Sequence, residues 1–133
     1  MKKIEHLGIA VKKFSVSIPL FEKLLDTTCY KTENVNSEQV NTAFFEIGEN
    51  KIELLEATGP QSAIHKFIEK KGEGLHHIAF EVDNIKKEMK RLTKAGFTFV
   101  NEQPKEGADN KMICFLHPKE TNGVLIELCM EKK

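Results

Sequence analysis

The chain has no tryptophan, one tyrosine and three cysteines among its 133 residues. Cys29, Cys114 and Cys129 show no Cys-x-x-Cys spacing, so neither a disulfide framework nor a thiolate zinc site is indicated. We expect Cys114 and Cys129 in the core and Cys29 at a strand edge. No apolar run approaches the roughly 20 residues of a membrane span, and the first residues lack the apolar core of a signal peptide. We therefore expect a cytoplasmic protein without a membrane partner.

The chain also lacks an excess of charge of either sign. Lys plus Arg number 20 and Asp plus Glu number 20, so the formal net charge is zero and no basic field would attract nucleic acid. Hydrophobic residues make up 40% and charged residues 30%, a globular composition. A chain of this length can bury a core without disulfides, and we expect one domain over residues 1–133.

The order strand, helix, three strands occurs twice, as hydrophobic periodicity and turn residues predict. In the first module, about 1–58, we expect a strand at 4–11, a helix capped by Ser15 with Ile18, Phe21, Leu24 and Leu25 on one face, and strands at 28–36, 40–47 and 50–56. In the second, about 72–133, we expect a strand at 75–82, a helix at 85–95 capped by Asn84, and strands at 97–101, 111–116 and 123–130. A short helix at 61–70 links them. The predicted fold class is α+β, with two tandem βαβββ modules whose sheets form a metal-binding cleft.

The repeat brings the same two residue types to matched positions. His77 follows His6 by 71 residues, and Glu127 follows Glu53 by 74. All four lie in otherwise apolar strands, where an unpaired buried charge is costly. Singly, each would be read as a solvent-facing residue, but their matched recurrence favours a metal site. Two imidazoles and two carboxylates suit a divalent transition metal ion such as Co, Ni, Zn, Mn or Fe and leave two octahedral positions for substrate oxygens.

The chain contains three other histidines that could serve as metal ligands in place of His6 or His77. His76 points to the opposite face of its strand from His77, and the repeat register sets it against Glu5. We therefore favour His77 as the ligand and expect His76 to support the site or face solvent. We expect His65 to be exposed, while His117 precedes a proline in a loop and fits a substrate contact or a turn equally well.

The duplicated unit with one His and one Glu per repeat resembles the vicinal oxygen chelate superfamily of glyoxalases, dioxygenases and bleomycin-resistance proteins. Within it, the chain most resembles the methylmalonyl-CoA epimerases. The stretches that carry this likeness are IELLEA (52–57), AIHKFIEKKGEGLHHIAFEVDNI (63–85) and FLHPKETNGVLIEL (115–128), within a similarity that runs from about residue 4 to 129.

The resemblance implies a site, a reaction and an assembly. It places the metal ligands at His6, Glu53, His77 and Glu127. It implies interconversion of (R)- and (S)-methylmalonyl-CoA through a metal-stabilised enolate, with Glu127 as ligand and general base. It also implies a homodimer that acts on a small acyl-CoA substrate.

The chain departs from the family in three places, one of which is the loop at 107–111, where the family often has more glycine. Some epimerases carry a further catalytic Glu on the strand after the first helix, and in the corresponding stretch, 39–45, Ala43 stands nearest to that position and no carboxylate is present. Glu120 and Asn122 also stand where small residues are common. If that loop touches the substrate, added acidity there would disfavour an anion.

Two other functions fit the same fold. A glyoxalase I-type lactoylglutathione lyase would use the same four ligands on a hemithioacetal, a thiol adduct. Its first strand typically offers an Arg soon after the His, whereas Leu7–Val11 contains none. A non-enzymatic drug-binding resistance protein fits less well, because such proteins tend to have aromatic-rich clefts and incomplete ligand sets.

Overall fold

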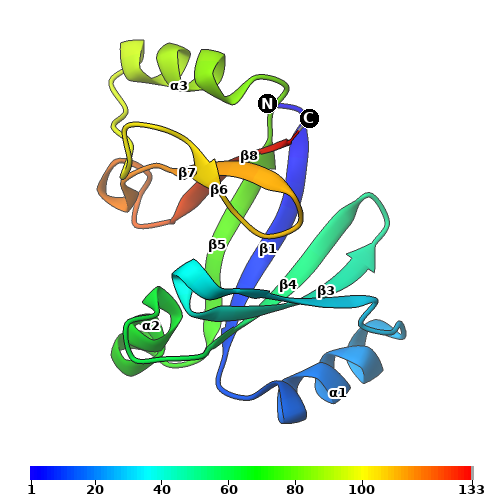
Figure 1. Ribbon diagram of the computed structural model, residues 1–133. Coiled ribbons are helices and arrows are strands. Elements are labelled where there is room, and N and C mark those ends of the chain that lie inside the picture. Colours follow the sequence, from blue (N-terminus) through cyan, green and yellow to red (C-terminus); the bar gives the residue numbers. More distant parts are fainter. Residues whose placement is uncertain (133) are drawn as a thin grey trace. The chain divides into compact units, whose positions relative to one another are not determined.

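The computed structural model describes residues 1–132, which form eight strands, three α-helices and two short 3-10 helices. The chain folds into two compact units. The N-terminal unit is His6–His76, and the C-terminal unit combines Met1–Glu5 with the chain from His77 onward. The boundaries fall inside strands β1 (Lys3–Val11) and β5 (Gly74–Glu81), labelled in Figure 1. Among the described residues, no helix has the length and apolar character needed to cross a membrane.

In the N-terminal unit, four strands of the sheet lie in the order β2-β3-β4-β1. Strand β3 is antiparallel to both of its neighbours, and β1 runs parallel to β4. Its elements after β1 are α1 (Phe14–Leu25), β2 (Lys31–Val35), β3 (Val40–Ile47), β4 (Asn50–Ala57) and α2 (Ala63–Lys71).

The C-terminal unit repeats this topology. Its strand order is β6-β7-β8-β5, with β7 antiparallel to both neighbours and β5 parallel to β8. Its elements after β5 are α3 (Ile85–Lys94), β6 (Lys105–Glu106), β7 (Lys111–Phe115) and β8 (Ile126–Glu131). The α+β class and the duplicated βαβββ unit are therefore confirmed.

Each helix covers one sheet face in its own unit. In the N-terminal unit, α1 packs on the face that carries Ala43, Phe45 and Leu54, and α2 packs beside Leu55 on the other face. In the C-terminal unit, α3 covers the face that carries Cys114 and Leu128. Because side chains alternate along a strand, Glu53 and Glu127 point away from the faces covered by α1 and α3.

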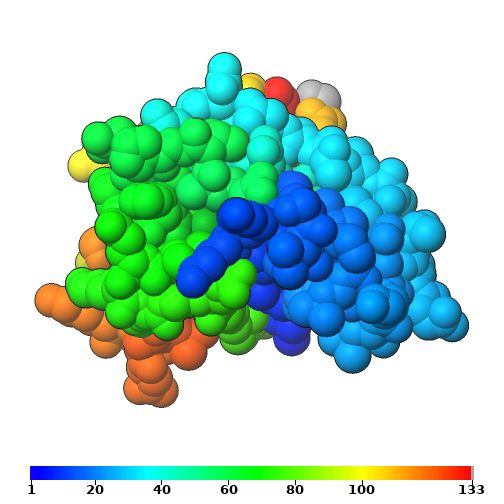
Figure 2. Space-filling view, turned by 90° about the horizontal axis from the view of Figure 1, so that it is seen from below, coloured from blue at the N-terminus to red at the C-terminus, as the bar shows by residue number. Residues whose placement is uncertain are grey.

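Helix α1 differs from its prediction at both the cap and the buried face. It begins at Phe14, before Ser15, and the Phe14 N–H donates to Glu56 Oε2 at 2.8 Å, so a carboxylate from β4 takes the expected role of Ser15. The placing of Leu24 on one face with Ile18, Phe21 and Leu25 is wrong, because only those three pack against the core. Leu24 is 70% exposed, and Val16 and Leu20 of the same helix are exposed as well. Figure 2 shows the α1 stretch, in blue, on the surface of the molecule.

The strand predicted at 97–101 is also wrong. Only Phe99 forms an isolated bridge, with Leu116. The preceding Thr98 N–H donates to Glu120 Oε1 at 2.7 Å and so is not available to a neighbouring strand. The edge of β7 pairs with β6, which lies between the strands expected at 97–101 and 111–116. This short strand completes the second βαβββ unit.

We predict that Leu54→Ala lowers the free energy of unfolding by about 2–5 kcal/mol, because it opens a cavity beneath α1 where Leu54 is fully buried. Urea unfolding followed by circular dichroism measures the change. Leu24→Ala removes the same atoms from an exposed position of the same unit and should cost under about 0.5 kcal/mol. Equal losses in the two variants would contradict the assignment of the buried face.

Candidate metal-binding and catalytic site

In the N-terminal unit, β1 and β4 bring His6 and Glu53 together. His6 Nδ1 lies 3.1 Å from Glu53 Oε2, and the two side chains are only 5% and 6% exposed. Leu54, the next residue, packs under α1, so the apolar side of β4 fixes the direction of the carboxylate by alternation. Because a buried carboxylate needs a compensating donor or cation, this pair is a candidate for half of a metal site.

The C-terminal unit builds the same pair from β5 and β8. His77 Nε2 lies 3.3 Å from Glu127 Oε1, and both side chains are 6% exposed. Ala79 of β5 and Phe115 of β7 lie on either side of Glu127 in the strand register. The structure thus brings one predicted His and one predicted Glu together within each module.

The separations within both pairs suit the coordination of one cation by neighbouring ligands. Imidazole nitrogen and carboxylate oxygen bind such ions at about 2.1 Å, so two adjacent ligands of an octahedron lie roughly 3.0 Å apart. The observed 3.1 and 3.3 Å fall near that value. The donor set, two nitrogens and two oxygens, is also the one that borderline divalent ions prefer. The residues present therefore fit a divalent transition metal.

Two phenylalanines beside the carboxylates were missed by the sequence analysis. Phe44 of β3 is the register partner of Glu53, and Phe115 of β7 is the partner of Glu127. The Phe115 ring meets the His77 ring edge-on, with centroids 5.9 Å apart. Both rings place an apolar wall next to a carboxylate. The signal was available, since Phe115 follows Phe44 by 71 residues, the interval that relates the two ligand histidines.

The position expected at Ala43 lies on the wrong side of the sheet. Ala43 pairs with Leu54 and is buried in the core beneath α1. Thr42 pairs with Leu55, two residues after Glu53, and so shares the face of Glu53. Thr42 is 1% exposed. The residue of β3 that accompanies Phe44 on the candidate site face is therefore Thr42, a hydroxyl and not a carboxylate.

His76 does not simply face solvent. Its ring packs edge-on against Phe67 of α2, with centroids 5.0 Å apart. Burial, with a smaller contribution from the charge of Lys71, lowers the pKa of His76 to about 4. The ring is therefore neutral at pH 7 and belongs to the packing of α2.

The remaining histidines have local roles. His65 Nε2 lies 3.4 Å from Glu69 Oε1 on α2, and its side chain is 43% exposed, in line with its predicted exposure. His117 is exposed, and its N–H donates to the carbonyl oxygen of Thr98 at 3.2 Å. That bond agrees with the turn role for His117.

The Glu120 carboxylate of the 117–123 loop is bonded to Thr98, on the segment before β6. Glu120 Oε1 accepts hydrogen bonds from the Thr98 N–H at 2.7 Å and from the Thr98 hydroxyl at 2.9 Å. These bonds lower the pKa of Glu120 below its usual value. Asn122 adopts φ of 56°, a left-handed turn conformation. Glu120 therefore has a structural reason for its place that does not involve a substrate.

The cysteines lie as expected and form no disulfide. Cys114 and Cys129 are buried, while Cys29 is half-buried just before β2, where its Sγ donates to the Lys31 carbonyl oxygen at 3.3 Å. Burial raises the pKa of the Cys114 thiol to about 12, and the nearby Glu127 carboxylate adds to the rise. Cys114 is thus an unreactive core residue at neutral pH.

Comparison with known families supports the duplicated architecture. Residues 5–115 match the model of the glyoxalase/bleomycin resistance protein/dioxygenase superfamily. The chain belongs to this superfamily. The expected resemblance to the vicinal oxygen chelate proteins is confirmed.

Individual relatives show which members of the superfamily the chain is similar to. The chain is 39% identical to the uncharacterized protein YqjC of Bacillus subtilis over 99% of this chain and 94% of that protein. It is 36% identical to the mitochondrial methylmalonyl-CoA epimerase of Dictyostelium discoideum, over 95% of this chain and 76% of the relative. A solved variant of the Streptomyces coelicolor methylmalonyl-CoA epimerase in complex with 2-nitronate-propionyl-CoA is 30% identical, with a TM-score of 0.94 over 98% of this chain and 95% of that one. These relatives confirm the expected likeness to an epimerase, a class of isomerase.

Proposed function

We propose that the chain is a metal-dependent epimerase that interconverts (R)- and (S)-methylmalonyl-CoA. The observation that carries this proposal is the buried imidazole–carboxylate pair that recurs in both modules. It occurs in a chain similar over nearly its whole length to methylmalonyl-CoA epimerases, one of which was solved with an acyl-CoA analogue. The fold alone would not fix the function, so the proposal depends on these residues and relatives together.

In this proposal His6, Glu53, His77 and Glu127 hold one divalent transition metal ion. When bound, the ion would supply Lewis acidity, which stabilises negative charge on a thioester carbonyl oxygen. The chain's own part is to keep the four ligand atoms buried, with side chains 5–6% exposed. Low exposure limits competition by water and strengthens electrostatic interactions.

Glu127 is the residue we propose as general base. It is 5% exposed and is the second residue of β8, which pairs with β5 on one side and β7 on the other, so the sheet holds its backbone. A carboxylate oxygen there would take the proton from the carbon between the thioester and the carboxylate of the substrate. Return of a proton to the opposite face of that carbon inverts its configuration. The Phe115 ring beside Glu127 would help to exclude water.

We predict that the purified protein contains about one divalent transition metal ion per chain, because four ligands complete one site. Elemental analysis should show that His77→Ala loses most of this metal, whereas His76→Ala, its neighbour packed on Phe67, keeps it. Undiminished metal in His77→Ala would contradict the ligand assignment. Two ions per chain would show that each pair binds its own ion, which would overturn the single site.

The reaction is tested by incubating metal-loaded protein with methylmalonyl-CoA in deuterated water. We expect deuterium to enter the α position and each pure epimer to convert to the mixture, as mass spectrometry and chiral analysis would show. The oligomeric state should be checked by light scattering on the same sample, because the resemblance implies a homodimer. No exchange, together with formation of lactoylglutathione from the hemithioacetal of methylglyoxal and glutathione, would assign the chain to the lyases.

A matched pair of variants tests whether Glu127 acts as a general base or only as a metal ligand. With metal saturating, we predict that Glu127→Gln lowers turnover about 100- to 10,000-fold, the usual cost of losing a general base. An amide oxygen can still coordinate, so the loss should exceed any loss of metal. Glu53→Gln makes the same change in the other module and should be tolerated. Equal turnover of the two variants would refute Glu127 as the base.

A further inference from the structure

One row of side chains crosses the N-terminal unit on the sheet face that carries Glu53. Phe44 of β3 is the register partner of Glu53 in β4, and Lys31 of β2 is the register partner of Phe44. Residues directly opposite each other in an antiparallel ladder point to the same face. Glu53, Phe44 and Lys31 therefore follow one another outward from the proposed metal ligand to β2, the last strand on that side of the sheet.

The outer end of the row combines a cation with two aromatic rings. The Lys31 Nζ lies over the Phe44 ring, 4.6 Å from its centroid, and the Tyr30 ring packs against the same ring with centroids 6.1 Å apart. Phe44 is fully buried, whereas the Lys31 side chain is 38% exposed and Tyr30 is 47% exposed. The buried ring therefore supports the other two side chains, and the cation–π contact helps to hold the ammonium group in place.

A carboxylate accompanies Lys31 on the same strand. Glu33 points to the same face as Lys31, since two residues make one repeat of a strand, and its Oε1 lies 3.8 Å from the Lys31 Nζ. An ion pair between partly exposed side chains contributes little stability, so a ligand can compete for both members. The pair offers one donor and one acceptor. An amide group satisfies both, whereas a phosphate group would be repelled by Glu33.

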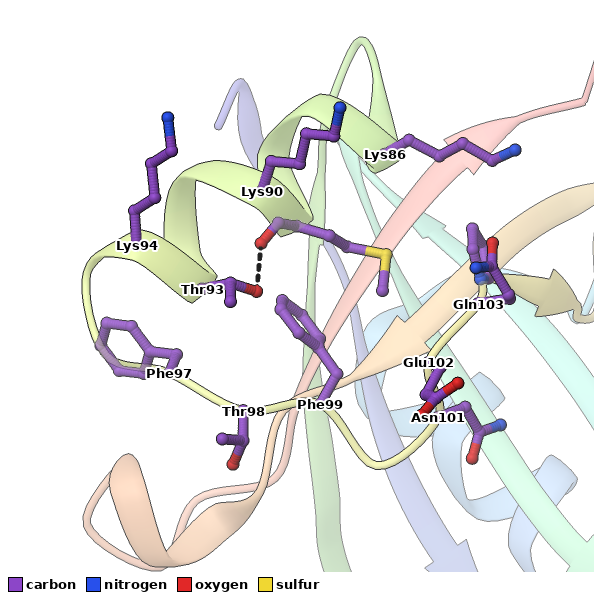
Figure 3. Close-up of a pocket in the computed structure, with 12 residues that line it drawn as sticks. Lys86, Lys90, Thr93, Lys94, Phe97, Thr98, Phe99, Asn101, Glu102 and Gln103 are labelled. Atoms are coloured by element: carbon purple, nitrogen blue, oxygen red, sulfur yellow. Dashed lines mark hydrogen bonds between the residues drawn. The ribbon is translucent and has the colours of Figure 1, made fainter.

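The corresponding row of the C-terminal unit lacks this outer end. Phe115 is the register partner of Glu127 there, but the two-residue strand β6 pairs earlier in β7 and does not reach Phe115. The segment before β6 lines a hollow with α3 instead. Figure 3 shows that Lys90 and Lys94 point off the outer side of α3, away from this segment. The extension of the row to a cationic edge strand is thus a feature of the N-terminal module.

We propose that Lys31 and Glu33 bind the amide-bearing pantetheine arm of an acyl-CoA substrate, an inference that rests on the proposed function. Neighbouring strands are about 4.8 Å apart, so β2 lies roughly 10 Å from Glu53 across the sheet. The carbonyl carbon of the second amide of the arm lies about nine bonds from the thioester carbon, a span of about 10 Å in an extended chain. Lys31 then donates to the oxygen of that amide, Glu33 accepts from its N–H, and the arm's methylene groups pack on the exposed Tyr30 ring.

Calorimetric titration of the metal-loaded whole chain with propionyl-CoA tests the inference without turnover, because this thioester has no stereocentre to invert. Lys31→Met removes the ammonium group and keeps the alkyl chain. It should weaken binding about tenfold, the effect of one hydrogen bond from a charged donor. Lys31→Arg keeps the charge and the contact with Phe44 and should bind within about threefold of the wild type. Lys23→Met makes the same change at an exposed position of α1 and should leave the affinity unchanged.

Truncated thioesters show which part of the ligand Lys31 contacts. S-propionyl-pantetheine keeps both amides without the nucleotide phosphates, and Lys31→Met should bind it about tenfold more weakly than the wild type does. S-propionyl-N-acetylcysteamine ends after the first amide, so the two proteins should bind it equally. A loss confined to propionyl-CoA would place Lys31 at the phosphates and overturn the proposal, as would an equal loss in Lys23→Met.

The deuterium-exchange assay separates this inference from the proposed reaction. Exchange by the wild type, with unchanged propionyl-CoA affinity in Lys31→Met, would retain the epimerase and reject the arm site. Weaker binding by Lys31→Met, without exchange by the wild type, would retain the arm site and reject the epimerase. No binding of propionyl-CoA to the wild type at about 1 mM would also reject the arm site.

Discussion

The burial of two carboxylates inside apolar strands constrains the rest of this structure. Glu53 and Glu127 are each 5% exposed, and an uncompensated buried ion costs several kcal/mol. Each unit meets that cost in the same way, with an imidazole nitrogen 3.1 or 3.3 Å from the carboxylate oxygen. The pairing requires the first strand of each module to lie beside the last, which is the parallel arrangement of β1 with β4 and of β5 with β8.

This constraint also fixes the strand register. A slip of one residue in β4 would turn Glu53 toward α1 and expose Leu54, because side chains alternate between the two faces. The neighbours across the sheet follow the same pattern in both modules. A small residue, Gly8 or Ala79, lies opposite the carboxylate on the histidine strand, and a phenylalanine lies opposite it on the other side. The small residue leaves space beside the carboxylate, and the ring keeps water away from its far side.

The sequence predicted the repeat, because the repeat depends on residue types that recur at fixed intervals. The sequence-based predictions failed where contacts between distant parts of the chain determine the local structure. The cap of α1 comes from Glu56, 42 residues beyond Phe14, and no local pattern reveals such a partner. The strand expected at 97–101 is reduced to a single bridge at Phe99, and Glu120 accepts a hydrogen bond from the Thr98 N–H that a longer ladder would use. Placing Ala43 beside the site missed the register by one residue, an error that reverses the face and that strand pairing alone corrects.

Duplication gives each module a buried acid, so the ligand set alone does not distinguish the two carboxylates. Their surroundings do. Glu53 shares its sheet face with Thr42 of the neighbouring strand, whereas Glu127 influences a buried thiol, Cys114, whose pKa it helps to raise. The module that carries Glu127 also has an edge-on contact between His77 and Phe115. If one acid moves a proton while the other only binds, the difference must arise from such neighbours, because the sheet presents both acids from equivalent positions.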